Sequence, residues 1–331
     1  MLTLDTSCGF PYKEYHSELS EDMTIFQTAE MLREFFKNAI VYALPQRKAI
    51  RTFTVKDDGE PVLIMPAFIN AQETCLAGHA NGICELNLIY FRGTEKRLQE
   101  YIEFLFGEIK SPKIRIDRVR EGSKLAVIMD KGIEGYLIKR RAIENVKIAF
   151  NNGYSEWING LSKSVRQNVR TAYNRLNTDG RILKMHMVSG GGQAHRSEIH
   201  RLIDVYIKRH RSRYNLKTST IKRFYLHHLD FSSRALMNNE RALHCVLTID
   251  DEISAFSSGY IDRGKYIVPR LSIDDGFSRY SPGYLLINEA IKAFSENDKV
   301  YAIDLSEGTE KYKLDLGGKV YNKLDFEIGR M

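Results

Sequence analysis

A corner that could bind phosphate is predicted where Ser281, Pro282 and Gly283 open a helix directly after a strand. Serine is a favoured N-cap, proline suits the first helical position, and glycine lets a ligand approach the backbone. The unpaired N–H groups at a helix N-terminus carry a partial positive charge that attracts a phosphate or pyrophosphate. The residue types therefore predict an anion-binding corner at this point of the chain.

The helix after this corner has one apolar face. Its apolar residues recur at spacings of three and four, at Leu286, Ile287, Ala290, Ile291 and Phe294. A well-capped helix without a ligand would show the same pattern. From these residues alone, the binding corner and a purely structural corner both stay open.

The positive charge of the chain is concentrated in one segment. The 331 residues carry a net charge of +7, and Ser155–Arg223 holds 15 basic residues against 4 acidic ones. Such a segment is expected to face an anionic partner. Charge alone does not distinguish a nucleotide cofactor, an acidic carrier protein, RNA and a membrane surface, and a solvated helical surface is a further alternative.

The composition favours a soluble, cytoplasmic protein. No apolar run approaches the ~20 residues of a membrane span, and no charged-then-apolar leader starts the sequence. The four cysteines form no CxxC pair and no zinc spacing, which favours buried free thiols over disulfides. The histidines are scattered without ligands at suitable spacing, so we expect no metal site.

The length predicts two domains with separate cores, and we place the boundary near residue 150, giving domains 1–150 and 151–331. The first domain is predicted to be an α/β unit. Its expected elements are helices at Thr28–Val41 and Thr94–Phe106 and strands at Ile50–Val55, Pro61–Ile69, Cys84–Tyr90, Lys113–Asp117 and Lys124–Met129.

The second domain is predicted to begin with a long helix and to contain an antiparallel sheet. Its expected helices are Ser155–Leu176, Ser197–Arg211, Ser219–His228, the helix from Ser281 and Glu310–Leu314. Two strands are expected at the boundary, at Tyr136–Arg140 and Val146–Phe150. The later expected strands are Ile182–Val188, Arg241–Ile249, Ile253–Ile261, Lys265–Ile273, Val300–Leu305 and Lys319–Phe326. Pro269 cannot donate to a sheet ladder, so the strand that contains it should be bulged or open on one side.

Three segments in this order resemble the GNAT superfamily of acyl-CoA-dependent acyltransferases. They are Trp157–Arg170, similar to the family's "W…LS…R.N.R" helix, Tyr280–Leu286, similar to its "SPG.LL" corner, and Ile303–Lys313, similar to its "DL..G…YK" segment. The branch that they resemble is that of the cellulose-biosynthesis-type acetyltransferases, relatives of the Fem-type peptidyl transferases. The resemblance implies a mixed α/β fold of two tandem GNAT-like domains, each a mostly antiparallel sheet flanked by helices, with a degenerate N-terminal copy.

The resemblance implies that acyl-CoA, as co-substrate, lies across the bulged strand with its pyrophosphate on the corner before the helix. The amide groups of pantetheine would form hydrogen bonds with backbone groups near Pro269 that have no partner in the sheet. The implied cofactor-binding residues are Arg270, Leu271, Ile273, Arg279, Ser281, Pro282, Gly283, Tyr284 and Leu285. Of the family's glycine-containing phosphate loop, only Gly283 has a counterpart here.

The same resemblance implies where the catalytic groups lie. Asp304 and Glu307 would end the splayed strand as candidate bases, Tyr312 is the candidate acid, and Lys313 would orient the acceptor or hold Asp304. An ion pair between Asp304 and Lys313 with only a structural role is the alternative. Secondary candidates for the acceptor pocket are His244, Asp262 and Arg270.

The implied function is N-acyl transfer, most simply of acetyl, from acyl-CoA to a small-molecule or saccharide amine. The acceptor class would be an amino-sugar in cell-surface polysaccharide synthesis or an amine of specialised metabolism. One alternative is a Fem-like transferase that uses aminoacyl-tRNA or an acyl carrier protein, although no long helical arm is inserted. The other is a non-catalytic module that binds CoA or nucleic acid.

Overall fold

The computed structural model describes residues 1–8, 24–28, 31, 49–76, 90–91, 95–192, 195–213, 226, 229–230, 233–234, 236–296 and 299–331. The chain forms two compact units. Unit 1 comprises Met1–Ile143 together with Asn322–Met331, and unit 2 comprises Glu144–Tyr321. The division therefore differs from two contiguous halves at residue 150. The last ten residues belong to unit 1 because strand β13 (Lys319–Arg330) pairs there with β6 (Lys113–Arg120).

Within its described residues, unit 1 is a mostly antiparallel sheet with the helices α2 and α3. Its strand order is β1 (Leu2–Ser7), β2 (Ala49–Asp57), β3 (Glu60–Ile69), β4 (Thr74–Leu76), β6 and β13, with β5 (Tyr90–Phe91) beside β3. The helices are α2 (Glu95–Glu108) and α3 (Lys124–Lys131), and η1 (Ile25–Gln27) is a short 3-10 turn. The predicted strands at Ile50–Val55 and Pro61–Ile69 are confirmed as β2 and β3, and they form a hairpin in which Asp57 pairs with Glu60 across the turn.

The prediction of a strand at Lys124–Met129 is wrong, because these residues begin α3. Ser123 caps the helix by accepting a hydrogen bond from Ala126 N–H (3.3 Å). Leu125, Ala126, Ile128 and Met129 are all buried, and they cover one face at helical spacing. A short apolar run does not by itself distinguish a buried helix from a strand, and the serine cap decides between them here.

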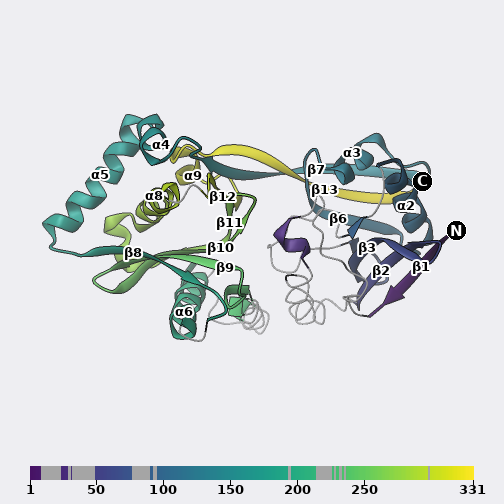
Figure 1. Ribbon diagram of the computed structural model, residues 1–331, viewed down its shortest axis with the longest axis horizontal. Coiled ribbons are helices and arrows are strands. Elements are labelled where there is room, and N and C mark those ends of the chain that lie inside the picture. The colour runs from purple at the N-terminus through teal and green to yellow at the C-terminus, as the bar shows by residue number, and fades with distance from the viewer. Residues whose placement is uncertain are drawn as a thin grey trace. The chain divides into compact units, whose positions relative to one another are not determined.

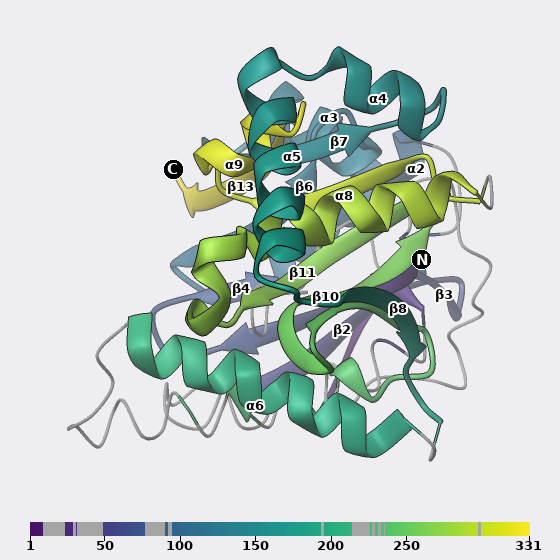
Figure 2. The same cartoon turned by 90° about the vertical axis from the view of Figure 1, so that its left-hand side faces the viewer.

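In the described part of the chain, unit 2 is built around six strands that are mostly antiparallel. Its strand order is β7 (Tyr136–Ala149, whose last residues lie in this unit), β12 (Ala302–Glu307), β11 (Lys265–Ile273), β10 (Glu252–Asp262), β9 (Ala242–Ile249) and β8 (Leu183–Ser189). Helix α6 (Arg196–Arg213) covers one face, and α8 (Pro282–Ser295) covers the other, with α5 (Lys163–Thr178) packed against α8 (Figures 1 and 2).

The expected long helix at Ser155–Leu176 is two helices, α4 (Tyr154–Gly160) and α5. Leu161 adopts an extended conformation, and Ser162 then caps α5 by accepting from Val165 N–H (3.3 Å). The apolar spacing continues across the break, so periodicity alone did not reveal it. The expected strand pieces at Tyr136–Arg140 and Val146–Phe150 form one strand, β7.

The two units share one topology. In each, antiparallel strands lead to a parallel pair, β4–β6 in unit 1 and β11–β12 in unit 2. A helix connects the strands of each pair, and a further antiparallel neighbour follows, β13 for β6 and β7 for β12. Both second strands are bulged at a residue with positive φ, Arg118 (64°) in β6 and Ser306 (56°) in β12. The predicted mixed α/β tandem fold is confirmed.

Three expected elements lie mainly or wholly outside the described residues: the helices at Thr28–Val41 and Ser219–His228 and the strand at Cys84–Tyr90. Within the described part of the chain, Cys8, Cys75 and Cys245 are free thiols, the first exposed and the other two buried. None of the helices described combines the length and the apolar character that crossing a bilayer requires.

Candidate functional site

Strands β11 and β12 separate part of the way along their length. Their parallel pairing joins Lys265 to Ala302 and ends where Ile267 meets Asp304. Beyond that point β11 continues as far as Ile273, and β12 continues as far as Glu307. Between the two ends, Ser306 Oγ donates to Val268 O (3.2 Å). The sheet therefore opens between two neighbouring strands, and backbone groups line the opening.

The separation coincides with the predicted irregularity at Pro269. The β10–β11 register shifts between Ser258 and Tyr260, so the prediction of a bulged strand is confirmed. Gly259 lies at this shift, where an added Cβ would sit 2.1 Å from Ile267 O. Only glycine lets β10 and β11 approach so closely at the bulge.

The pairing of β10 with β11 determines which way the backbone groups of β11 point. Asp274 N–H donates to Ser254 O (2.8 Å). In an antiparallel ladder alternate residues bond to the same neighbour. Ser272 therefore bonds toward β10, whereas Leu271 and Ile273 direct their backbone groups to the side from which β12 has departed. Ile273 O is already used, because it accepts from Arg209 Nη1 (3.0 Å).

The expected corner follows immediately. A 3-10 helix, η4 (Asp275–Tyr280), connects β11 to α8, and Pro282 occupies the start of α8 as predicted. Ser281 stands at the N-cap, but its side chain makes no capping bond, and its φ of 50° is left-handed. Its carbonyl instead accepts from the N–H groups of Tyr284 (3.0 Å) and Leu285 (3.3 Å).

Gly283 carries the remaining amide of this first turn. Proline has no N–H, and in the described part of the chain the Gly283 amide has no acceptor. A Cβ added at Gly283 would meet only Ile273 Cγ2, at an ordinary 3.5 Å. Packing therefore does not require a glycine here, and its main effect is to leave the amide accessible beside the end of β11.

Three further corner residues are held by two carboxylates. Arg279 Nε donates to Asp179 Oδ2 (2.9 Å), and Tyr280 OH donates to the same oxygen (2.8 Å). These hydrogen bonds, led by that of Arg279, keep the pKa of Asp179 below its usual value. Tyr284 OH donates to Asp315 Oδ2 (2.9 Å), and burial together with this carboxylate raises the pKa of Tyr284 to about 12.

Asp304 lies at the base of the opening and is 4% exposed. Ser306 N–H donates to its Oδ1 (2.9 Å), and Tyr321 OH donates to its Oδ2 (2.5 Å). The carboxylate therefore ties the bulge of β12 to β13.

Lys313 is also buried, at 3% exposure, but it does not pair with Asp304. Its ammonium donates to the carbonyls of Leu305 (3.0 Å), Glu307 (2.6 Å) and Gly308 (3.1 Å), and it forms an ion pair with Glu310 (2.9 Å). The alternative of a structural Asp304–Lys313 ion pair is therefore wrong. Lys313 instead gathers the carbonyls of the loop that follows β12.

Residues 163–314 match the family model described as "Acetyltransferase (GNAT) domain". These residues form a GNAT domain. The predicted resemblance to the GNAT superfamily is confirmed over these residues, which contain two of the three motifs in full and the second part of the first. A search of the curated proteins found no match for the chain.

Solved structures share the fold of the whole chain. A conserved protein of unknown function from Bacteroides thetaiotaomicron matches with a TM-score of 0.58 at 14% identity, over 94% of this chain and 93% of the other. FemX matches with a TM-score of 0.58 at 9% identity, over 96% and 94%. The C-terminal domain of a putative lysylphosphatidylglycerol synthetase from Agrobacterium fabrum matches with a TM-score of 0.52 at 10% identity, over 89% and 91%. The chain thus shares its overall fold with these three proteins.

The remaining predicted residues lie at different parts of the GNAT domain. Glu307 is exposed at the end of β12, and Tyr312 is half-buried on α9 (Lys311–Asp315), packed against the core beneath α8. Leu285 and Pro282 are buried in the helix start.

Arg270 does not face the corner. It is 4% exposed on the α6 side of the sheet, where its Nε donates to Ser233 Oγ (3.2 Å) and its guanidinium lies 5.9 Å from the ring centre of Tyr206. His244 is fully buried near this region of the GNAT domain, with Nε2 2.9 Å from Met237 O. Asp262 ends β10, opposite Lys265 in the hairpin. These three secondary candidates are thus not gathered at one point.

Four residues that shape the site were not predicted: Asp179, Ser306, Asp315 and Tyr321. Each acts through a partner on another element, as Asp179 does for Arg279 one hundred residues away. The printed sequence holds no local signal for such pairs. Only Ser306, two residues after Asp304 in the motif, could have been suspected from its position.

Proposed function

We propose that unit 2 is an N-acyltransferase that moves an acyl group, most simply acetyl, from acyl-CoA to an amine. The observation that carries this proposal is the opening between β11 and β12 next to the Gly283 amide. The backbone of Leu271 would pair with the pantetheine amides, and the Gly283 N–H would donate to the pyrophosphate. The family match over residues 163–314 supports this assignment.

In the proposed reaction the amine nitrogen attacks the thioester carbonyl carbon at the base of the opening. A carbon–nitrogen bond forms, the carbon–sulfur bond breaks, the nitrogen gives up a proton and the departing thiolate receives one. Glu307, exposed at the end of β12, is the proposed base. Tyr312 is the proposed acid toward the sulfur.

Asp304 and Lys313 are assigned a different task. The two oxygens of Asp304 already accept hydrogen bonds, and Lys313 is surrounded by carbonyls. We propose that both hold β12 and its following loop in the open geometry. The acceptor that we favour is a small amine or an amino-sugar of cell-surface polysaccharide or specialised metabolism, in the cytoplasm.

The test is a thermal-shift measurement with coenzyme A and acetyl-CoA. A ligand that binds only the folded state raises the melting temperature. Gly283→Glu places a carboxylate against the phosphates and is expected to abolish the shift. Gly283→Ala is the matched control, since its Cβ meets only Ile273 at 3.5 Å, and it is expected to keep most of the shift. A full shift in Gly283→Glu would overturn the proposed corner.

A second candidate is transfer from aminoacyl-tRNA or from an acyl carrier protein. It is favoured by α5, which contains no acidic residue and exposes Lys163 and Arg170 without ion pairs among the described residues. Adding tRNA to the same panel separates the two candidates. Binding of tRNA that falls steeply with salt, without any shift by coenzyme A, would favour this donor class.

A further inference from the structure

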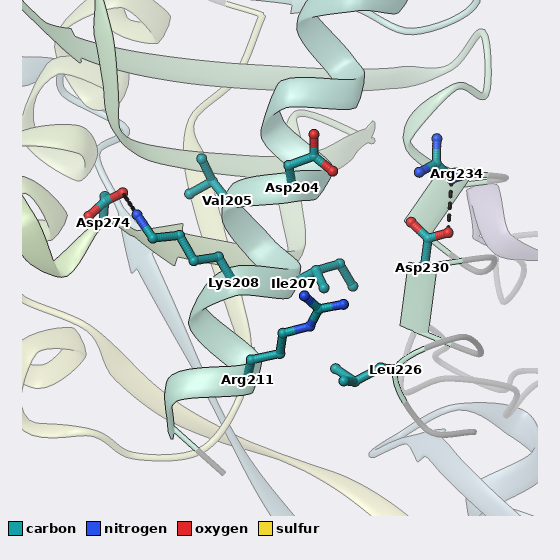
Figure 3. Close-up of a pocket in the computed structure, with 9 residues that line it drawn as sticks. All are labelled: Asp204, Val205, Ile207, Lys208, Arg211, Leu226, Asp230, Arg234 and Asp274. Carbon is teal, nitrogen blue, oxygen red and sulfur yellow. Dashed lines mark hydrogen bonds and ion pairs between the residues drawn. The ribbon is translucent and has the colours of Figure 1, made fainter. Parts of the chain in front are cut away.

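A cavity of about 710 Å³ lies beside α6 in unit 2, on the face of the sheet opposite α8 (Figure 3). Its apolar wall is formed by Val205, Ile207 and Leu226. The volume is in the range of small-molecule pockets, which typically span roughly 300–1,000 Å³. The motifs on α8 and β12 do not account for this cavity.

The charges around the cavity are balanced. Six charged side chains line it in the described part of the chain, three of each sign. Lys208 pairs with Asp274 (Nζ–Oδ2, 2.9 Å), and Arg234 pairs with Asp230 (Nε–Oδ2, 3.0 Å). Asp204 and Arg211, both exposed, are left: neither forms a hydrogen bond or an ion pair within the described residues, and Asp204 acts on Arg234 only through its charge. The cavity thus offers one carboxylate and one guanidinium.

The two unpaired groups lie on one helix, two turns apart, and Figure 3 shows both beside the same space, across from Asp230 and Arg234. Seven residues of α-helix span about 10 Å. Helical side chains lean toward the helix N-terminus, so the long arginine reaches back along α6 in the direction of Asp204. The carboxylate of Asp204 and the guanidinium of Arg211 are therefore farther apart than the ammonium and carboxylate groups of an α-amino acid, which are joined through a single carbon.

We infer that this cavity binds an elongated zwitterion of the short-peptide class. Asp204 would hold its ammonium end, Arg211 would bind its carboxylate, and Ile207 and Leu226 would contact the apolar part between them. A guanidinium binds a carboxylate through two parallel N–H bonds. Because the cavity is electrically balanced within a basic segment, it suits a zwitterion better than a polyanion.

This inference rests on the proposed function, because the bound zwitterion would be the amine acceptor of the proposed acyl transfer. Asp274 links the cavity to the donor corner, since its Oδ2 accepts from Lys208 while its Oδ1 caps η4 by accepting from Gly276 N–H (2.9 Å). Arg209, on the helix that lines the cavity, donates to Ile273 O at the end of the part of β11 that does not pair with β12. The cavity thus adjoins the strand that would bind the donor.

The experiment measures binding of L-alanyl-L-leucine by isothermal titration, without any donor. L-alanyl-L-leucinamide lacks the carboxylate, and N-acetyl-L-alanyl-L-leucine lacks the ammonium group. Each loss is expected to weaken binding about tenfold, the usual effect of one charge-assisted hydrogen bond. Arg211→Gln should remove the preference for the free carboxylate, and Asp204→Asn should remove the preference for the free amine. Arg201→Gln, exposed on the same helix outside the cavity lining, is the control.

Absence of dipeptide binding, or equal binding of the three compounds, would overturn the inference. So would unchanged preferences in Arg211→Gln and Asp204→Asn. The donor is tested separately by the coenzyme A thermal shift. Dipeptide binding without that shift would reject the acyl-CoA reaction and keep the pocket, whereas the shift without dipeptide binding would reject the pocket and keep the reaction.

Discussion

Tyr321 on β13 donates its phenolic hydrogen to Asp304 on β12, and this bond occupies one carboxylate oxygen at the base of the opening. The other oxygen accepts from Ser306 N–H (2.9 Å), whose left-handed backbone forms the bulge of β12. A carboxylate that already accepts two hydrogen bonds is well suited to holding a backbone shape. It is less suited to taking a proton from a substrate.

We therefore predict that Asp304→Asn and Glu307→Gln have different effects. An asparagine presents one oxygen where two are needed, so one donor loses its acceptor, and the free energy of unfolding should fall by about 2 kcal/mol. Glu307→Gln removes the proposed base and should lower kcat about 100-fold with little change in stability. Urea unfolding and steady-state kinetics measure the two quantities.

Tyr321→Phe is the control for this prediction. It removes only the hydroxyl group, so stability should fall as in Asp304→Asn, while the carboxylate that could act as a base is kept. A rate loss of about 100-fold in Asp304→Asn, with near-normal rates in both Tyr321→Phe and Glu307→Gln, would reverse the two assignments.

The second prediction concerns the buried ammonium group of Lys313. Lys313→Met fills a similar volume but leaves the carbonyls of Leu305, Glu307 and Gly308 without their buried donor. The free energy of unfolding should fall by about 3 kcal/mol, as is typical when a buried charged partner is removed. Urea unfolding measures this loss. Lys311→Met, on the same short helix but exposed, should change stability by less than about 0.5 kcal/mol.

Helices and strands with a clear periodicity of apolar residues could be predicted from the sequence, whereas contacts between residues far apart in the sequence could not. The apolar face of α8 and the hairpins of β9, β10 and β11 follow from local spacing and turn residues. Periodicity reports which side of an element is buried, but not against what. The bond between Asp304 and Tyr321 and the contribution of β13 to unit 1 both join residues whose proximity only the complete fold determines.

Two errors in the predicted elements have the same local cause. A serine cap at Ser123 turns an apolar run into α3, and a serine cap at Ser162 starts α5 within what looked like one long helix. In both cases the apolar spacing was ambiguous, and one side-chain hydrogen bond to the backbone resolved it. At the site, the effects of Pro269 and Gly283 could be predicted because these two residue types have unusual backbone properties. The role of Lys313 could not, because it depends on carbonyl groups that come close only in the folded chain.

The third prediction concerns the charge next to the donor corner. Asp179 places a carboxylate beside Arg279, so it would oppose a phosphate bound at Gly283. Asp179→Asn should tighten coenzyme A binding about threefold at low salt, and Arg279→Gln should weaken it by a similar factor. Both effects should shrink at high salt, because exposed charges are screened. Titration calorimetry at two salt concentrations checks this.

Asp251→Asn provides the control, since Asp251 is an exposed carboxylate that pairs with Lys184 (2.8 Å) at the β9–β10 turn. It changes the net charge by the same amount and should leave the affinity nearly unchanged. Equal tightening by Asp179→Asn and Asp251→Asn would show that only net charge matters and would remove the support for a specific corner.

The fourth prediction is a dependence of stability on pH that arises from His244. The pKa of this fully buried imidazole is lowered to about 4, chiefly by burial and to the smallest extent by the neighbouring Arg270, against the opposing effects of Met237 O and Glu198. The unfolded chain takes up the proton near pH 6.5, so stability is fully present above that pH and is lost as the pH falls toward 4. The contribution of His244 to this loss should reach about 3 kcal/mol. In His244→Gln, whose amide can still donate to Met237 O, unfolding measured by urea between pH 7 and 4 should lack this component, and identical pH profiles for the two proteins would contradict the buried, neutral imidazole.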